Sequence, residues 1–595
     1  MSFLSLLIYV VAKALHSKNI SPVSFARIVS IVFIYAGVLS SNAFFVQTIG
    51  QGIGIYSGLF EVSSISLFID ILIFFIGGLI LVSWPSISKT QLLYPVKNNL
   101  LSLQKNTDLH TVKLNNAGEY SLIVLFSTIG ASLLISSGDL ISMYLSIELQ
   151  SFGVYILSSI FRDSESSTFA GLKYFLLGGL SSCIILLGSV ILYSYTGLTN
   201  FESIYSLVAI SDGELVSHGL SLGFILIILG FLFKIGAAPL HNWSPDVYED
   251  TPTIVTIWLT IMPKISIIIF LLELFSQIDI IGNNVSMVEQ IVFLDTIKET
   301  SSIFISFSDL KEIVSLTNNL NPEKLIGENT GYIVKNLLLI SSLLSLIIGT
   351  IVGLAQTKLK RLLTYSTISH VGFILLALAI NSEQSIDSLI FYIVQYTITN
   401  LNTFLIILGF GYILKNIILI KNSEFLALGE TGTERDIKEI KELTGQFFSN
   451  PLLSISLTIC LFSMAGIPPL MGFFGKQFVL YSAIQSGYYF MSIVGIIVSV
   501  ISASYYLKII KVLHSSKVEE ETNSKKSGIC DSFNHSIASL EQLATEGQSQ
   551  SAATKITNFH SFLISGLTLS ILIFILKPSI LLNSTQLLSL SLFCY

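Results

Sequence analysis

The stretch FKIGAAPLHNWSPDVYEDTPTIVTIWLTIMPK, from Phe233 to Lys264, joins two apolar segments that each carry a lysine. Mostly apolar residues precede Lys234, and mostly apolar residues also precede Lys264, so both lysines are predicted to lie inside helices. Gly236 and Pro239 follow the first lysine, and proline removes a backbone donor, which predicts a broken helix. A lysine beside a helix break in an apolar segment is typical of an ion path through a membrane.

The composition of the whole chain agrees with a membrane protein. Charged side chains make up 11 % of the 595 residues, under half of the roughly 25 % of soluble domains, and mean hydropathy is +0.77. A soluble fold of this size is therefore excluded, and an all-α polytopic membrane protein is predicted. The net charge is −6, and the basic residues are dispersed, so no nucleic-acid partner is expected.

Apolar runs of about 20 residues, the length that spans a bilayer, mark fourteen predicted transmembrane helices. Helices 7 and 12 are predicted to be broken. Because helix breaks at matching positions in two halves of a transporter indicate inverted repeats, helices 4–8 and 9–13 are predicted to form two inverted five-helix units. The fourteen runs cover residues 2–15, 25–46, 62–84, 119–137, 139–160, 168–195, 217–240, 252–276, 332–355, 362–381, 386–418, 452–485, 488–512 and 558–577.

These runs and the polar segments between them divide the chain into regions. In TERDIKEIKEL, residues 433–443, the charges are spaced as in one exposed helix, whereas residues 278–330 suggest short amphipathic structure. The predicted regions are an N-terminal three-helix region at 1–118, a first antiporter-like unit at 119–276, a polar insertion at 277–331, a second unit at 332–512 with a charged loop at 422–449, a flexible loop at 513–557 and a C-terminal helix at 558–595.

The distribution of basic residues supports alternating helices. Of 31 lysines and arginines, 23 fall in loops or helix ends on one predicted side, five on the other and three inside helices. Positive loops collect on one side of energised membranes, so this split supports the proposed order of spans.

A few ionisable residues lie inside the predicted spans, and His241 and His370 are expected near helix ends. At the bilayer centre each charge costs about 2.5–3.5 kcal/mol, which favours a function for the lysines. Glu148 is the predicted partner of Lys234, and a pair that forms and breaks would act as a proton switch. For Asp70 and both histidines, structural packing is as good an interpretation as a proton relay. The charged residues inside the spans are Asp70, Glu148, Lys234, Lys264 and Lys476.

Other kinds of site are not indicated. The four cysteines, Cys183, Cys460, Cys530 and Cys594, have no metal-binding or redox spacing, and there is no HExxH or Walker motif. We therefore expect no catalytic residue, cofactor site or metal site in this chain.

Four stretches together resemble the antiporter-like membrane subunits of respiratory complex I. They are the opening stretch, KYFLLGGLSS (Lys173–Ser182), KRLLTYSTISHVGF (Lys360–Phe373) and FSMAGIPPLMGFFGKQF (Phe462–Phe478). The resemblance covers about residues 120–510. Pro468 and Pro469 in the last stretch break helix 12 beside Lys476. The N-terminal extension is like that of the long, non-animal forms.

The resemblance implies proton translocation coupled to quinone reduction elsewhere in the complex. It assigns Glu148, Lys234, Lys264 and Lys476 to the proton path and matches Lys173 to a basic residue at the start of helix 6. Lys173 therefore joins His241 and His370 as a possible relay. It also implies that FMN, iron–sulfur clusters and ubiquinone are held by other subunits, and that neighbouring antiporter-like subunits, small membrane subunits and lipid are the partners. Arginine occurs only four times, which suggests the AT-rich coding genome of an organelle or of an AT-rich bacterium. The organelle interpretation predicts a multi-pass protein of the mitochondrial inner membrane with basic loops in the matrix.

Two alternatives remain open from the sequence. A subunit of a multisubunit Na⁺/H⁺ antiporter would share the buried lysines without NADH chemistry. A structural membrane scaffold would use the charges only for helix packing, although the broken helices argue against it.

Overall fold

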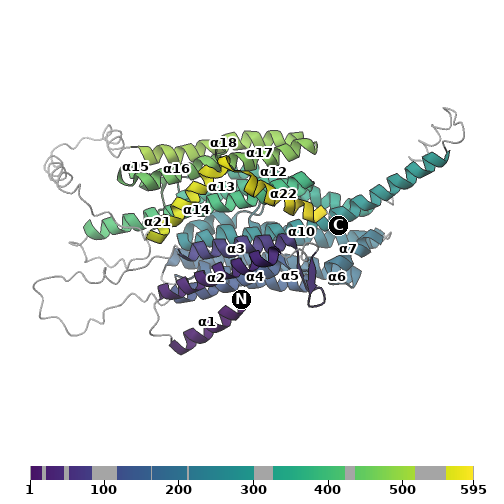
Figure 1. The fold of residues 1–595 in the computed structure, drawn as a ribbon, viewed down its shortest axis with the longest axis horizontal. Helices are drawn as coiled ribbons and strands as arrows, with labels where there is room; N and C mark the ends of the chain where they lie inside the picture. Colours follow the sequence, from purple (N-terminus) through teal and green to yellow (C-terminus); the bar gives the residue numbers. More distant parts are fainter. Residues whose placement is uncertain are drawn as a thin grey trace, which may run out of the picture.

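The computed structural model describes residues 2–16, 22–45, 52–82, 117–161, 164–210, 214–300, 326–421, 436–515 and 558–593. The described part is a bundle of helices with one two-stranded antiparallel hairpin, in which Ile53 pairs with Val62. Figure 1 shows the helices running along the long axis of the molecule. The predicted loop at 513–557 lies outside the described residues, except for its first three positions.

The N-terminal half begins with α1 and α2, continues through the hairpin, and ends in the long helix α10 (Figure 1). Its elements are α1 (Ser2–His16), α2 (Pro22–Phe44), β1 (Ile53–Ile55), β2 (Phe60–Val62), α3 (Ser64–Val82), α4 (Ala117–Ile135), α5 (Leu140–Ser158), α6 (Glu165–Thr196), α7 (Phe201–Ile210), α8 (Glu214–Ile235), α9 (Trp243–Asp250) and α10 (Thr253–Thr300).

The C-terminal half contains long helices and several short ones. Its elements are α12 (Ile326–Leu354), α13 (Leu359–Ile380), α14 (Glu383–Lys421), the 3₁₀ turn η6 (Ile440–Leu443), α15 (Gln446–Ser449), α16 (Pro451–Ala465), α17 (Met471–Gln485), α18 (Tyr489–His514), α21 (Asn558–Ile573), the 3₁₀ turn η7 (Phe574–Leu576) and α22 (Ser579–Phe593).

The helical membrane fold predicted from composition is confirmed. Ten helices among the described residues are long and apolar enough to cross a bilayer, and four shorter apolar helices accompany them. Each predicted span contains a helix, and the span 452–485 contains two, α16 and α17. The number of crossings and the inverted relation between the two units stay predictions.

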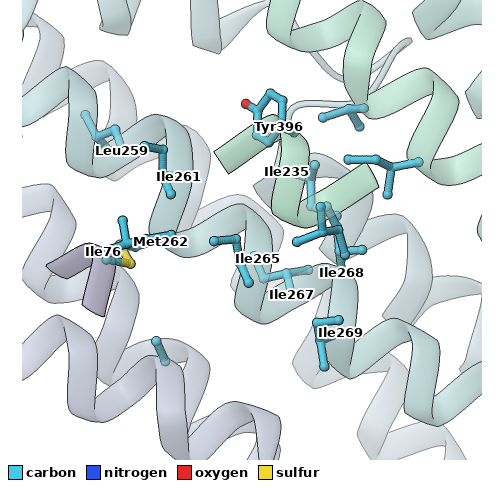
Figure 2. Close-up of a cluster of buried hydrophobic side chains, with 14 of the residues drawn as sticks. Ile76, Ile235, Leu259, Ile261, Met262, Ile265, Ile267, Ile268, Ile269 and Tyr396 are labelled. Atoms are coloured by element: carbon cyan, nitrogen blue, oxygen red, sulfur yellow. The ribbon is translucent and has the colours of Figure 1, made fainter. Parts of the chain in front are cut away.

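Three helices form the centre of the bundle. The most apolar stretches of α10, α13 and α14 are 100 %, 94 % and 94 % buried, whereas those of α6 and α18 are 39 % and 33 % buried. A helix that is apolar on every side is buried, so the uniform apolar run after Thr253 places α10 inside. Figure 2 shows Ile261, Met262 and Ile265 of this helix, with Ile76 of α3 beside Met262.

Secondary structure differs from expectation in two polar segments. α10 is one continuous helix from Thr253 to Thr300, so it extends into the segment predicted as a polar insertion at 277–331, whose bounds stay a prediction. The exposed helix expected at 433–443 is also absent from the part of it that the structure describes, residues 436–443. There the chain is extended at Glu439, which bridges to Lys358, and only η6 follows. Ile437 and Ile440 are buried in this segment, so tertiary packing overrides the helical charge spacing.

Loops that the alternating order assigns to one side meet at one end of the bundle. Ion pairs connect α6, α9, the start of α13 and the segment before η6. The hairpin contacts the loops that the order assigns to the other side: Gly138 donates its amide to Leu59, and the Asn200 amide donates to the Gly58 carbonyl. We call the first end the basic-loop end and the second the hairpin end.

Candidate functional site

A buried ion pair joins α5 and α8. Nζ of Lys234 lies 3.3 Å from Oε1 of Glu148, and the two side chains are 6 % and 15 % exposed. Ser151 Oγ is 3.5 Å from the other carboxylate oxygen. With little water to solvate them, each charge is stabilised mainly by the other, so the protonation states of the two groups depend on each other. The structure thus brings together the two residues that were predicted to pair.

The first predicted helix break lies directly after Lys234. α8 ends at Ile235, and Gly236 has a φ of 77°, a left-handed conformation that favours glycine. The amides of Gly236 and Ala237 both donate to the Leu232 carbonyl, and the Trp243 indole donates to the Phe233 carbonyl at 2.9 Å. Pro239 lies in the loop that follows. The break is therefore held by polar contacts inside the protein, as the membrane interior requires.

A small cavity of about 20 Å³ lies beside Lys234. Gln150, Tyr155, Trp243 and Pro263 contribute to its wall. That volume is enough for about one water molecule, and the amide and hydroxyl groups around it could bind one. Because Pro263 precedes Lys264 on α10, the cavity lies between the helix of the first lysine and that of the second.

Lys264 is 3 % exposed and connects α10 with the second half of the chain. Its ammonium donates a hydrogen bond to Oγ1 of Thr367 on α13 at 3.1 Å. It also lies 5.5 Å from the centre of the Tyr248 ring, where the aromatic face attracts a cation. No acidic side chain is ion-paired with Lys264 among the described residues.

Pro263 weakens α10 beside this lysine, and the Tyr248 hydroxyl supplies the missing hydrogen bond. Proline has no amide hydrogen for the Leu259 carbonyl, which instead accepts a hydrogen bond from Tyr248 Oη at 3.3 Å. The next carbonyl, that of Thr260, accepts from Tyr396 Oη at 3.2 Å. These tyrosines were missed by sequence reasoning. Pro263 predicts that the Leu259 carbonyl needs another donor, since a proline inside a helix frees the carbonyl four residues earlier, but it does not predict which residue provides it.

His370 lies farther along α13 and is 4 % exposed. Its Nδ1 is 2.7 Å from Tyr392 Oη, and its Nε2 is 3.3 Å from Tyr506 Oη. It is within electrostatic range of both Lys264 and Lys476. The expectation that His370 lies near a helix end was wrong, because it occupies the middle of α13.

Lys476 binds the end of α16, the first of the two helices in the broken twelfth span. Its ammonium donates to the carbonyls of Met464 and Ala465 at 2.8 and 3.0 Å. These are the last residues of α16, and a helix C-terminus carries partial negative charge. The ammonium also lies 5.8 Å from the centre of the Phe373 ring. Lys476 is thus held by backbone carbonyls, whereas Lys234 is held by a carboxylate.

The two breaks share one backbone geometry. After α16, Gly466 has a φ of 86°, and the amides of Gly466 and Ile467 both donate to the Phe462 carbonyl, as Gly236 and Ala237 do to Leu232. Each glycine is followed by a proline in a cis peptide, Ala238–Pro239 in one and Pro468–Pro469 in the other. The shared glycine turn and the matching amide contacts support two related units, with a lysine at each break.

An ion-pair network lies at the basic-loop end and includes Lys173. The Asp246 carboxylate accepts from Lys173 of α6 and Arg361 of α13, and Glu249 pairs with Arg361 at 3.0 Å and with Lys358. Burial acts to raise the pKa of Asp246, but the bonds from Lys173 and Arg361 bring it below its ordinary value. Lys173 is 29 % exposed, so the structure places it in this network and not among the buried lysines. Sequence reasoning missed the acids of α9.

His241 lies between α8 and α9 and is 8 % exposed. Its ring is 6.4 Å from the Tyr365 ring, and Nδ1 has no hydrogen-bond partner within the described part of the chain. Burial lowers the pKa of His241, although a hydrogen bond with the Pro239 backbone opposes that shift. His241 is therefore neutral near pH 7.

Acidic groups also occur near the hairpin end. A cavity of about 310 Å³ is lined by Glu61, Glu202 and Glu273, and Ser63 Oγ donates to Glu273 at 2.9 Å. Glu273 lies inside the predicted span 252–276 and was missed. Oδ1 of Asp70 is buried without a hydrogen-bond partner among the described residues, and Asp70 interacts electrostatically with Glu273. Neither Asp70 nor Glu273 is among the described hydrogen-bond or ion-pair partners of Lys234, Lys264 and Lys476.

The described residues offer no metal site. No group of three histidine, cysteine or acidic side chains is close enough in this part of the chain to hold an ion. The chemistry that the described arrangement supports is proton transfer among lysine, histidine, tyrosine and glutamate side chains.

Comparison with known proteins agrees with this arrangement. Residues 137–316 and 324–502 match the family described as NADH:quinone oxidoreductase/Mrp antiporter, TM. The chain is 44 % identical to the NADH-ubiquinone oxidoreductase chain 2 of Rhizopus oryzae over 593 residues, which cover 100 % of both chains.

Two solved complexes contain chains of similar fold. One is respiratory complex I from Thermus thermophilus with bound aureothin, with a TM-score of 0.62 and 21 % identity over 98 % of this chain and 99 % of that one. The other is the Mrp complex from Dietzia sp. DQ12-45-1b, with a TM-score of 0.65 and 16 % identity over 100 % and 96 %. The two TM-scores are similar, so the fold alone does not distinguish a chain of respiratory complex I from a chain of an Mrp complex.

Proposed function

Since the chain belongs to the NADH:quinone oxidoreductase/Mrp antiporter membrane family, we propose that it carries protons along Glu148, Lys234, Lys264 and Lys476. It is a membrane-arm subunit of NADH:ubiquinone oxidoreductase, the complex named for its full-length relative in Rhizopus oryzae. It is also a multi-pass protein of the mitochondrial inner membrane.

One observation carries the proposed path: polar groups continue through the apolar centre of the bundle from one break to the other. The Glu148–Lys234 pair is followed by the one-water cavity, then by Lys264 with its bond to Thr367. His370, with hydroxyl partners on both ring nitrogens, follows on the same helix as Thr367 and leads toward Lys476.

The contacts suggest how the charges alternate. Separating Glu148 from Lys234 would remove the main stabilisation of the Lys234 ammonium and favour release of its proton. Lys264 has a neutral acceptor and an aromatic face, so its charge is held less firmly than in an ion pair. Lys476, at the C-terminus of α16, could receive the proton and release it. Each proton moves against about 2.3 kcal/mol per 100 mV of membrane potential.

The redox chemistry belongs elsewhere in this proposal. This chain acts as a non-redox subunit, and FMN, iron–sulfur clusters and ubiquinone are held by other subunits. Its exposed apolar helices, such as α6 and α18, would contact lipid or neighbouring membrane subunits. Lys173 and His241 lie at the basic-loop end, where protons would first meet the protein.

The Na⁺/H⁺ antiporter alternative is less supported. The fold likeness to the Mrp complex rests on 16 % identity, whereas the match to the Rhizopus chain is 44 % over the full length. Sodium-dependent transport by a complex without flavin and iron–sulfur clusters would favour the antiporter.

The test is the number of protons moved per NADH oxidised by the assembled complex in vesicles. Lys234→Ala and Lys476→Ala should each lower this ratio, because each removes a charge-carrying group from the path. Lys508→Ala, an exposed lysine on α18, is the matched control and should leave the ratio unchanged. An unchanged ratio in both path variants would overturn the lysine assignment.

A further inference from the structure

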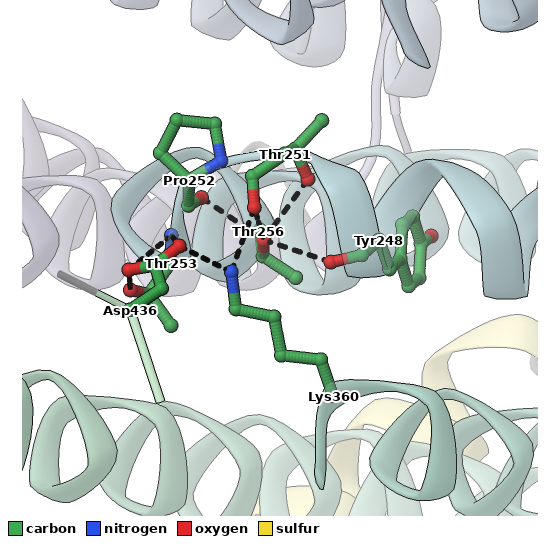
Figure 3. A network of polar contacts seen from close by, with 7 residues as sticks. All are labelled: Tyr248, Thr251, Pro252, Thr253, Thr256, Lys360 and Asp436. Carbon is green, nitrogen blue, oxygen red and sulfur yellow. Dashed lines mark hydrogen bonds and ion pairs between the residues drawn. The ribbon is translucent and has the colours of Figure 1, made fainter. Parts of the chain in front are cut away.

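A buried lysine outside the proton path joins the two halves of the chain. Lys360, in the first turn of α13, is 3 % exposed, and its ammonium bonds the Asp436 carboxylate and the Thr251 carbonyl, the latter at 2.8 Å. Asp436 in turn accepts from the amide and hydroxyl of Thr253, where α10 begins. Figure 3 shows Lys360 reaching across to this cluster. The ammonium is therefore paired with a carboxylate and with a backbone carbonyl in one cluster.

Thr251, whose carbonyl Lys360 binds, belongs to one compact turn between α9 and α10. Thr256 Oγ1 lies 3.0 Å from Thr251 Oγ1 and donates to the Pro252 carbonyl at 3.0 Å, with a longer contact of 3.4 Å to the Tyr248 carbonyl. The end of α9 and the start of α10 are therefore fixed to each other, as Figure 3 shows, and Lys360 fixes both to α13.

Both direct contacts of Lys264 depend on these same elements. Tyr248, whose ring lies 5.5 Å from the Lys264 ammonium, belongs to the turn that Lys360 holds. Thr367, which accepts from Lys264, lies on α13 about two turns after Lys360. α10 and α13 both begin at the basic-loop end. The contacts of Lys360 with Thr251 and Asp436, here called the clasp, therefore fix how the two helices align at the deeper Lys264–Thr367 contact.

We infer that Lys360 is a positioning residue for proton transfer, which holds Tyr248 and Thr367 in register around Lys264. This inference rests on the proposed function. A misplacement of about 1 Å between reacting groups can slow a reaction on the order of 100-fold. Loss of the clasp should therefore slow proton transfer through this chain by a similar factor, although Lys360 touches no group on the path.

The experiment compares Lys360→Met with Lys358→Met in the whole complex, by protons moved per NADH oxidised. Both variants remove one positive charge from the start of α13, but Lys358 is 49 % exposed and pairs with Glu249 at the surface. We expect Lys360→Met to lower the ratio to the level of Lys264→Met, and Lys358→Met to retain the wild-type ratio. Lys360→Arg, which keeps the charge, should recover most of the loss.

A double variant separates positioning from a general loss of structure. If Lys360 acts through the Lys264–Thr367 contact, Lys360→Met combined with Thr367→Val should lower the ratio no further than Thr367→Val alone. Should Lys360→Met fail to assemble, Asp436→Asn breaks the same ion pair from the other partner and should give the same result.

The outcomes distinguish this inference from the proposed function. A wild-type ratio in Lys360→Met or Asp436→Asn, together with a lowered ratio in Lys264→Met, would overturn the positioning role alone. Additive losses in the double variant would also overturn it. A wild-type ratio in Lys264→Met would instead contradict the proposed function itself.

Discussion

Lys264 on α10 is joined to Thr367 on α13 by a buried hydrogen bond of 3.1 Å between Nζ and Oγ1. The bond links the two predicted units at the depth where the proposed path passes from one to the other. A hydroxyl both accepts and donates hydrogen bonds, so Thr367 can hold the lysine in either protonation state. A carboxylate at the same place would fix the charged form.

Thr367→Val removes this acceptor while keeping the shape of the side chain. Hydrogen bonds to charged groups contribute about 1.5–3 kcal/mol, so the Lys264 ammonium should be destabilised and protons moved per NADH should fall. Thr364→Val is the matched control, since Thr364 is equally buried and its hydroxyl donates to the Lys360 carbonyl of its own helix, while its carbonyl, which accepts from Thr367, is unchanged by the substitution. Equal ratios in the two variants would exclude a role for Thr367.

Glu148→Gln should strongly slow proton transfer while preserving the shape of the Lys234 site. The variant leaves a neutral amide 3.3 Å from the ammonium, so the Lys234 charge loses its partner. General acid–base groups contribute typically 10²–10⁴-fold, and we expect a loss on the order of 100-fold in proton transfer through this chain. The measurement is proton uptake into vesicles during NADH oxidation. Glu148→Asp should retain more transfer than Glu148→Gln, and the reverse order would show that the charge is not the relevant property.

Four buried charges were predictable from the sequence because a charge is costly in a membrane. Lys234, Lys264 and Lys476 stand out from apolar runs, and Glu148 was the predicted partner of Lys234, as the structure has it. The breaks were also predictable, since glycine and proline act on the backbone locally.

Contacts between distant segments could not be predicted in this way. Thr367, Tyr248 and Lys360 carry no local signal, because their roles depend on how α9, α10 and α13 meet. The segment at 436–443 shows the same limit. Its charge spacing suits a helix, but Lys358 and Lys360 hold it as an extended chain followed by one 3₁₀ turn.

Gly472→Ala should destabilise the second break. A Cβ at this position would lie 1.8 Å from the Ser463 carbonyl oxygen, so α17 would have to move away from α16. Overpacking of this kind costs typically about 1–3 kcal/mol, and the carbonyls that bind Lys476 lie directly after Ser463. Thermal unfolding of the purified complex and its proton ratio should both decline. Gly566→Ala, where a Cβ meets nothing within 4 Å, should change neither.

Asp246→Asn should weaken the surface network by a modest amount that depends on salt. The three side chains are 29–35 % exposed, and exposed ion pairs contribute about 0–1 kcal/mol each. The pKa of Asp246 is lowered from 3.8, so its stabilisation is present above that pH and is lost as the pH falls further. The unfolding temperatures of variant and wild type should differ at low salt and converge at high salt. A difference that persists at high salt would indicate a contribution other than charge.

His241→Gln should reduce the loss of thermal stability that the complex shows as the pH falls. Burial lowers the pKa of His241 from 6.5, so protonation is easier in the unfolded chain than in the folded one. Stability from the neutral ring is therefore fully present above pH 6.5 and declines as the pH falls below that value. Glutamine does not titrate, so the variant should lose less thermal stability than wild type when the pH is lowered through this range, while the two behave alike at higher pH. Parallel curves would mean that His241 titrates equally in both states, which its 8 % exposure argues against.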